Sequence, residues 1–92
     1  MVLHLVNNSH SALQQCLHYL GPQDSLLLIQ DGVFASAAEQ ALIGPYKDRV
    51  YALEDDLQQR GLDKKAPDWL QRIGYSGFVE LTVSHAKTQS WF

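Results

Sequence analysis

Cys16 is the single cysteine of the 92-residue chain and the one thiol that could act as a nucleophile. One cysteine excludes an intramolecular disulfide and a cysteine-based zinc site. A thiol that acts as a nucleophile must be accessible and partly deprotonated. Cys16 lies about two turns into a predicted helix, beyond the reach of the helix dipole, on an apolar stripe with Leu13 and Leu17. His18 points to another side of that helix and cannot serve as its base. The residues leave two interpretations open, a buried inert thiol and a reactive thiol.

Two further pairs of residues lie where a sheet protein makes contacts. Asp31 and Gly32 follow the aliphatic run of SLLLIQDGV, and ligands and partners gather beyond the carboxyl ends of parallel strands. Asp-Gly is also a common turn former, so a turn and a contact site both stay open, with the turn favoured. Trp91 and Phe92 at the end of the sequence form either a terminal strand or an aromatic anchor in a subunit interface. We favour the interface, because an aromatic chain end is rarely left uncovered.

The elements that must position these residues begin with a buried strand. Leu26 to Ile29 are four consecutive aliphatic residues without polar alternation, which predicts a central strand covered on both faces. Val2 to Val6 predicts another strand, in which His4 is expected to be a satisfied core or interface residue. Between them, Ser9 to Leu20 shows the spacing of an amphipathic helix that Asn8 or Ser9 caps and Gly21-Pro22 ends.

Strands and helices alternate through the rest of the chain. Residues Glu54 to Arg60 predict a short helix that contains an Asp56–Arg60 ion pair and ends at Gly61. The acidic residues at the start of this helix are interpreted as solvated, so no metal site is predicted there. For residues 76–86 a helix capped by Ser76 is favoured over a strand, although Val79, Leu81 and Val83 alternate. The other predicted elements are a helix over Val33 to Ile43, a strand over Arg49 to Leu53, a strand within Trp69 to Tyr75 and a short strand over Gln89 to Phe92.

This alternation predicts one domain over residues 1–92, a three-layer α/β/α sandwich with a mostly parallel sheet of four to five strands. Hydrophobic residues make up 46% of the chain, which is typical of a globular domain, and charged residues only 18%, which suggests that another subunit covers part of the surface. The net charge of −3 and the scattered basic residues argue against direct nucleic-acid binding. We expect a cytoplasmic protein, because the start lacks a secretory signal and no apolar segment is long enough to span a membrane.

Three motifs together resemble a known family. LLLIQDGV, RVYALEDDLQQRGL and YSGFVELTVSHAKTQSW are similar to the DsrH/TusB family of sulfur-relay proteins, which have the DsrE-like fold. The resemblance covers nearly the whole chain in order. It implies a heterohexamer with TusC-like and TusD-like subunits, which passes persulfide sulfur from a TusA-like donor to a TusE-like acceptor for 2-thiolation of the tRNA wobble uridine. DsrH-like members form the analogous complex with DsrE and DsrF in dissimilatory sulfur oxidation. DsrH-like chains also carry a cysteine on the first helix, as LQQCLHYL does.

The leading hypothesis is therefore a non-catalytic or accessory subunit of a sulfurtransferase complex, with Cys16 as a candidate sulfur carrier and no cofactor. In both branches the principal sulfur-accepting cysteine belongs to the TusD or DsrE subunit. One alternative is a structural interaction module without thiol chemistry. Another is a small flavodoxin-like nucleotide-binding domain, which the lack of a glycine-rich phosphate loop weakly disfavours.

Overall fold

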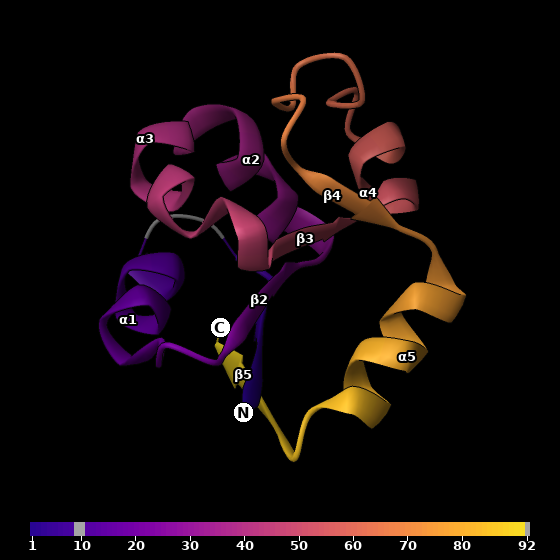
Figure 1. The fold of residues 1–92 in the computed structure, drawn as a ribbon. Coiled ribbons are helices and arrows are strands. Elements are labelled where there is room, and N and C mark those ends of the chain that lie inside the picture. The colour runs from indigo at the N-terminus through magenta and orange to yellow at the C-terminus, as the bar shows by residue number, and fades with distance from the viewer. Residues whose placement is uncertain (9–10, 92) are drawn as a thin grey trace.

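A computed structural model describes residues 1–8 and 11–91 of the protein. Strands and helices alternate along the chain (Figure 1). In order they are β1 (Val2–Val6), α1 (Ser11–Tyr19), β2 (Ser25–Leu28), the 3₁₀ helix η1 (Gln30–Phe34), α2 (Ala35–Ala38), α3 (Gln40–Ile43), the 3₁₀ helix η2 (Gly44–Arg49), β3 (Val50–Leu53), α4 (Glu54–Gln59), β4 (Gln71–Ile73), α5 (Tyr75–Ser84) and β5 (Lys87–Trp91). Within the described residues, no helix has the length and apolar character that a membrane span requires.

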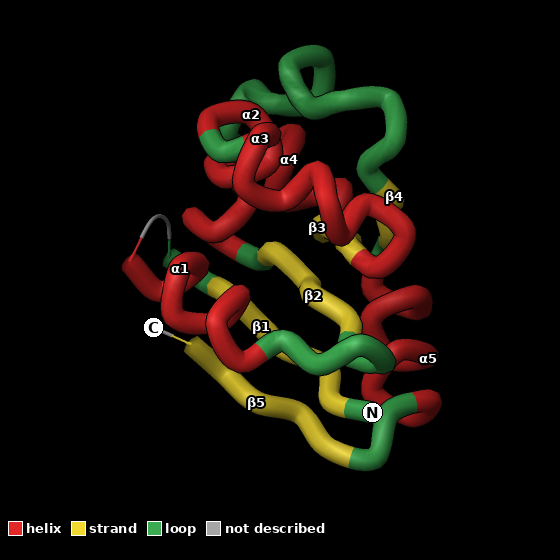
Figure 2. Tube along the Cα trace, turned by 60° about the vertical axis from the view of Figure 1, so that its left-hand side comes forward, coloured by secondary structure: helices red, strands yellow, loops and turns green. Residues whose placement is uncertain are grey.

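The five strands form one sheet in the order β4-β3-β2-β1-β5, and every neighbouring pair is parallel. Helices α1 to α4 cover one face of this sheet, and α5 lies alone on the other (Figure 2). The predicted α/β sandwich is confirmed, and the sheet is entirely parallel. Because β5 follows β4 in sequence but pairs with β1, the chain crosses the whole sheet through α5, and its two terminal strands lie side by side.

Strand β2 stands at the centre of the sheet, as predicted, and all four of its residues are buried. Leu26 and Leu28 belong to the large apolar cluster beneath α1 to α4, which also contains Leu13 and Leu57. Leu27 points to the opposite face because side chains alternate along a strand, and it is also fully buried. The strand is shorter than the aliphatic run, since it ends at Leu28.

The prediction of one helix over residues 33–43 is wrong. The segment is divided into η1, α2 and α3, and Glu39 between α2 and α3 has φ −121° and ψ 35°, outside the helical region. Phe34 and Ala35 keep helical dihedral angles, so the chain passes from η1 into α2 without a break. The interruption lies at Glu39, although the alanine-rich composition favours one continuous helix. Asp31 and Gly32 lie within η1, whose first i→i+3 hydrogen bond runs from the Gly32 N–H to the Ile29 carbonyl, in agreement with the favoured turn interpretation.

Glycine ends α4 as the sequence predicted. Gly61 adopts φ 68°, a left-handed conformation that glycine tolerates best. The N–H of Leu62 donates to the Leu57 carbonyl over 2.8 Å, which closes the end of the helix. The predicted pair of Asp56 and Arg60 is also present, with 3.7 Å between carboxylate and guanidinium.

The C-terminal helix and strand are present with shifted bounds. Residues 75–84 form α5, so the helix prediction is confirmed over the strand alternative, but Gly74 occupies the N-cap position that Ser76 was expected to fill. His85 fixes the end of α5 to the sheet, because its Nε2 lies 2.9 Å from the Ser25 Oγ. The terminal strand begins at Lys87, earlier than predicted, and Phe92 lies outside the described residues, as does Ser9.

Candidate functional site

The segment after β2 places Gly32 against the end of β1. Gly32 is buried, and a Cβ atom on it would stand 2.0 Å from the Val6 carbonyl oxygen. Its N–H donates to the Ile29 carbonyl over 2.8 Å. Only glycine allows this approach of one backbone to another. Gly32 therefore serves to close the carboxyl end of β1 and β2.

Asp31 beside it is exposed and held in a surface network. Its carboxylate accepts a hydrogen bond from the Arg60 Nε over 2.9 Å, and 66% of its side chain is exposed. Asp56, the second carboxylate near Arg60, accepts the N–H of Gln30 over 2.7 Å, and Gln30 itself has φ 51°. These contacts fix the unusual backbone after β2. Exposed ion pairs of this kind contribute less than about 1 kcal/mol each.

Cys16 is fully buried on the side of α1 that faces the sheet. Burial raises the pKa of its thiol from 9.0 to about 12, and the negative charge of Asp24 adds to the rise. At neutral pH the reactive thiolate is therefore scarcely populated in this conformation. The placement agrees with the core interpretation, and sulfur transfer by Cys16 stays a prediction.

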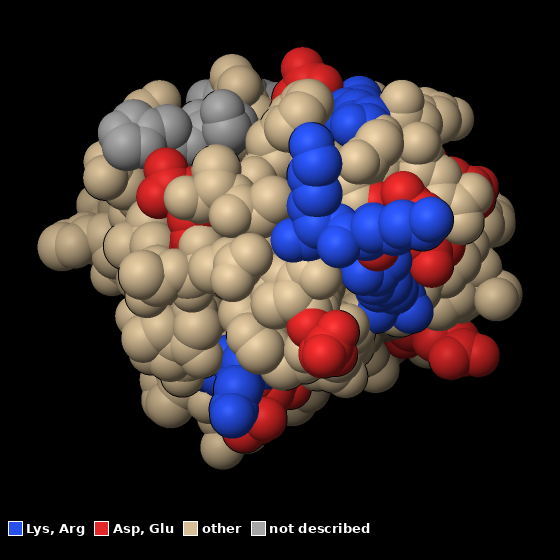
Figure 3. Space-filling model, turned by 90° about the horizontal axis from the view of Figure 1, so that it is seen from above, with Lys and Arg blue, Asp and Glu red and all other residues tan. Residues whose placement is uncertain are grey.

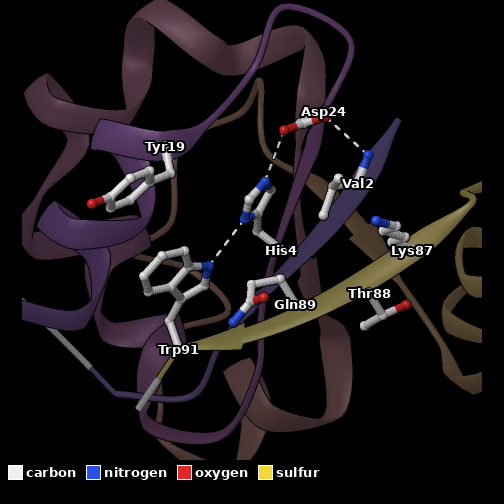
Figure 4. Close-up of a pocket in the computed structure, with 8 residues that line it drawn as sticks. All are labelled: Val2, His4, Tyr19, Asp24, Lys87, Thr88, Gln89 and Trp91. Atoms are coloured by element: carbon white, nitrogen blue, oxygen red, sulfur yellow. Dashed lines mark hydrogen bonds and ion pairs between the residues drawn. The ribbon is translucent and has the colours of Figure 1, made fainter.

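Trp91, His4 and Asp24 form a connected series of hydrogen bonds, which we call the His4 network (Figure 4). The Trp91 Nε1 donates to the His4 Nδ1 over 3.0 Å, and the His4 Nε2 lies 2.9 Å from the Asp24 Oδ2. The same carboxylate accepts the backbone N–H groups of Val2 and Gly21, over 2.9 Å and 2.8 Å. His4 is 4% exposed, so the predicted satisfied core histidine is confirmed.

The network fixes the proton positions on His4. An indole N–H can only donate, so Nδ1 must accept, and Nε2 carries the proton that it donates to Asp24. Burial raises the pKa of Asp24, but the hydrogen bonds from His4, Gly21 and Val2 outweigh burial and lower it from 3.8 to about 2. Asp24 is thus a firmly ionised acceptor at neutral pH.

A cavity of about 350 Å³ opens beside the His4 network. Its walls come from α1, β1 and β5 (Figure 4). The Tyr19 ring, which is 66% exposed, stacks on Trp91 with 5.7 Å between centroids. An Asp–His pair can activate a nucleophile, but here the third member is an indole N–H, and both ring nitrogens of His4 are occupied. The arrangement is suited to binding and to fixing β5, and it has no free general base in His4. The lining residues are Val2, His4, Tyr19, Asp24, Lys87, Thr88, Gln89 and Trp91.

Comparison with known proteins identifies the family. Residues 7–88 match the family model described as DsrH like protein. Protein TusB of Enterobacter sp. (strain 638) is 37% identical over 97 aligned positions, which span 98% of this chain and 100% of that protein. Protein TusB of Serratia proteamaculans (strain 568) is 45% identical over 73 positions, 74% of this chain and 75% of that protein. This chain belongs to the DsrH/TusB family.

Membership of the DsrH/TusB family supports a role in the sulfur-relay system of tRNA thiolation. It also implies a complex with TusC and TusD partners. The resemblance that the three sequence motifs indicated is thereby confirmed over most of the chain.

In this DsrH/TusB member, the predicted site residues do not form one site. Trp91 lines the cavity and belongs to the terminal strand, Cys16 lies in the core within the field of Asp24, and Asp31 and Gly32 lie beyond the carboxyl end of β2. Phe92 lies outside the described residues. Whether Asp31, Gly32 and Trp91 contact partners stays a prediction.

Sequence analysis missed Asp24 and Tyr19 as parts of the site. The signal for Asp24 was His4 itself, because a histidine in an aliphatic strand needs a polar partner once it is buried. The identity of the acidic partner depends on the pairing of β1 with β2. This pairing sets His4 opposite Leu26, close to Asp24 just before the start of β2.

Charged side chains of both signs are mixed on the surface. On the face seen from above in Figure 3, several Lys and Arg side chains adjoin one another right of centre, and Asp and Glu side chains lie directly beside them. Arg60 pairs with Asp31 and Asp56, and Arg72 lies 3.5 Å from Glu54. Part of the basic charge is therefore neutralised locally. Among the described residues, no group of three or more His, Cys, Asp or Glu side chains is arranged to hold a metal ion.

Proposed function

We propose that this chain is a non-catalytic or accessory subunit of a cytoplasmic sulfur-relay complex, acting in 2-thiolation of the tRNA wobble uridine. The observation that carries the proposal is the match to TusB proteins, which extends over 98% of the chain for the Enterobacter relative. In the proposed complex, TusC-like and TusD-like subunits join this chain in a heterohexamer. Sulfur arrives as a persulfide from a TusA-like donor and leaves to a TusE-like acceptor.

The accessory role follows from the state of the thiol. Cys16 is fully buried and its pKa is raised to about 12, whereas a relay cysteine has to attack a donor persulfide as the thiolate. The family resemblance implies that the principal sulfur-accepting cysteine belongs to the TusD-like subunit, and the burial of Cys16 agrees with that. Cys16 is the candidate carrier within this chain, and it could act only after assembly exposes it.

The DsrH role in dissimilatory sulfur oxidation, with DsrE-like and DsrF-like partners, is the second pathway for the same complex. The named relatives above are TusB proteins, which favours tRNA thiolation. Membership of the family gives no support to the nucleotide-binding alternative.

The test is reconstitution of the relay with and without this chain. Co-expressed with the TusC-like and TusD-like subunits of its own organism, the chain should enter a complex whose native mass fits two copies of each subunit. Sulfur transfer to the TusE-like acceptor should fail when this chain is omitted. A relay that runs equally well without it, or a chain that never joins the complex, would refute the proposal.

The Cys16→Ala variant separates the accessory role from thiol chemistry. It removes the sulfur and little volume, so assembly and sulfur transfer should both persist. If the variant assembles normally but transfer stops, Cys16 is a required carrier. The mass of one added sulfur on the wild-type chain after incubation with a persulfidated donor, absent in the variant, would support the same conclusion.

A further inference from the structure

The geometry points to the outer edge of β5 as the docking edge for an extended segment of a sister subunit, which adds to the sheet as a sixth strand. This inference rests on the proposed function, because it names the surface through which the chain joins its relay partners. Three observations carry it: an open row of backbone groups, a rigid support behind that row, and a cavity alongside.

Among the described residues, the backbone of β5 pairs with another strand on one side only, and on its outer side the exposed Gln89 side-chain amide donates to the Ser90 carbonyl over 3.2 Å, a contact that an added strand would replace. The register of β5 with β1 runs without a bulge from Val2 opposite Lys87 to Val6 opposite Trp91. The Trp91 carbonyl accepts the N–H of Asn7, so the polar groups of Trp91 point toward β1. Because successive residues of a strand direct these groups to opposite edges, the N–H and C=O groups of Thr88 and Ser90 point outward. Such groups form hydrogen bonds with water or with another strand.

The other edge of the sheet is shaped differently. Strand β4 has three residues, Gln71–Ile73, all half-buried, and the Gln71 side chain donates to the Asp48 carbonyl over 3.0 Å. Short edge strands are one way in which proteins prevent further strand pairing. Strand β5 has five residues, the first four of them exposed, without a proline or a bulge. Of the two edges, β5 is the one that remains competent to pair.

The edge is also held rigid before any partner arrives. The Trp91 indole is bonded to His4, which Asp24 fixes in turn, and Tyr19 stacks on the other side of the indole. A preformed edge loses little conformational entropy on binding, so more of the interaction energy appears as affinity.

The cavity beside β5 identifies the chemistry of the added segment. Lys87, Gln89 and Trp91 occupy alternate positions of β5 on its cavity side. An added strand would place every second side chain on that same side, and recognition by strand addition uses pockets for these alternate side chains. The polar atoms of His4 and Asp24 already have partners. The aromatic rings of Tyr19 and Trp91 therefore suit an apolar or aromatic side chain of the sister subunit, beside Lys87 and Gln89 on the same wall.

Residue-resolved amide hydrogen exchange tests the docking edge directly. In the isolated chain, the outward amides of Thr88 and Ser90 should exchange rapidly, while the inward amides of Gln89 and Trp91 are protected by β1. In the complex with TusC-like and TusD-like subunits, Thr88 and Ser90 should slow on the order of 100-fold, with little change at Gln89 and Trp91. A complex that assembles while Thr88 and Ser90 still exchange rapidly would overturn the docking edge and leave the proposed function intact.

Two variants at one position separate backbone from side chain. Ser90→Pro removes an outward N–H and should weaken assembly about tenfold or more. Ser90→Ala keeps the backbone group and should assemble as the wild type does. Equal loss in both variants, or in neither while Ser90→Pro remains folded, would contradict strand addition. If Ser90→Pro does not fold, the exchange experiment decides alone. Protection that appears in the isolated chain as its concentration rises would identify a second copy as the occupant and overturn the sister-subunit assignment.

Discussion

Replacing Asp24 by asparagine should destabilise the fold far more than one surface charge would. Each oxygen of the Asp24 carboxylate accepts hydrogen bonds, Oδ1 from the Val2 N–H and Oδ2 from Gly21 and His4. An amide offers one oxygen and one NH₂ group, so either orientation sets a donor against a donor. His4 cannot compensate by moving its proton to Nδ1, because the Trp91 N–H already points there.

The expected loss of stability in Asp24→Asn has two contributions, the lost carboxylate interactions and a donor left without a partner. The pKa of Asp24 falls from 3.8 to about 2 in the folded chain, and at 1.36 kcal/mol per pKa unit this corresponds to about 2 kcal/mol of stability. The Asp24 side chain is only 13% exposed, so solvent screening removes little of it. A donor left unsatisfied in this position costs about 1–3 kcal/mol. Because the two terms overlap, we expect the variant to lose about 2–4 kcal/mol at pH 7, or on the order of 10–25 °C in Tm.

Urea unfolding of the purified chain between pH 2 and pH 8 measures the effect. A depressed carboxyl pKa adds stability that is complete above the unfolded value of 3.8 and is lost as the pH falls through about 2. The gap between wild type and Asp24→Asn should therefore be constant above about pH 5 and shrink toward pH 2. Asp68→Asn, at an exposed carboxylate, is the matched control and should lie within about 0.5 kcal/mol of the wild type. A gap below that size at pH 7, or one that does not shrink in acid, would refute the role given to the His4 network.

Two other outcomes follow from burial. Gly32→Ala should lower the free energy of unfolding in urea by about 3 kcal/mol or more, because the new Cβ would stand 2.0 Å from the Val6 carbonyl oxygen. In the control Gly44→Ala the new Cβ meets nothing within 4 Å, so this variant should be neutral or slightly stabilising. Similar losses in both variants would contradict the packing described. Alkylation of Cys16 by iodoacetamide at pH 7, followed by mass spectrometry, should be about 1,000-fold slower in the folded chain than in denaturant, because its thiol pKa is raised from 9.0 to about 12; equal rates would show that the thiol is accessible.

The sequence predicts the sheet well where one residue class dominates. Leu26 to Leu28 lie in a short aliphatic run between turn-forming residues, which favours a strand covered on both faces, and the structure confirms it. Gly61 likewise marks the end of α4 by its own backbone freedom. The prediction fails at residues 33–43, where alanine favours one continuous helix but Glu39 leaves the helical region.

The site was less predictable because its members are far apart in sequence. His4 lies 20 positions from Asp24 and 87 from Trp91. The local pattern shows only that His4 sits among aliphatic residues and must be satisfied. Its partners follow from the pairing of β1 with β2 and β5, and the return of β5 to the far side of β1 is a property of topology that no single segment encodes.

The same carboxylate links the shape of the edge to the state of the thiol. Asp24 holds His4, and through it Trp91 and β5, while its negative charge adds to the rise in the pKa of Cys16. An intact His4 network therefore holds the edge strand through Trp91 and adds to the rise in the Cys16 pKa that burial mainly causes. For Cys16 to carry sulfur, assembly would have to expose α1's buried side, and that movement would disturb the cavity that Tyr19 of α1 shares with Trp91. Strand addition at β5 needs the opposite, an undisturbed His4 network. We therefore expect two results together in the complex. The amides of Thr88 and Ser90 should be protected from hydrogen exchange, and Cys16 should carry no added sulfur.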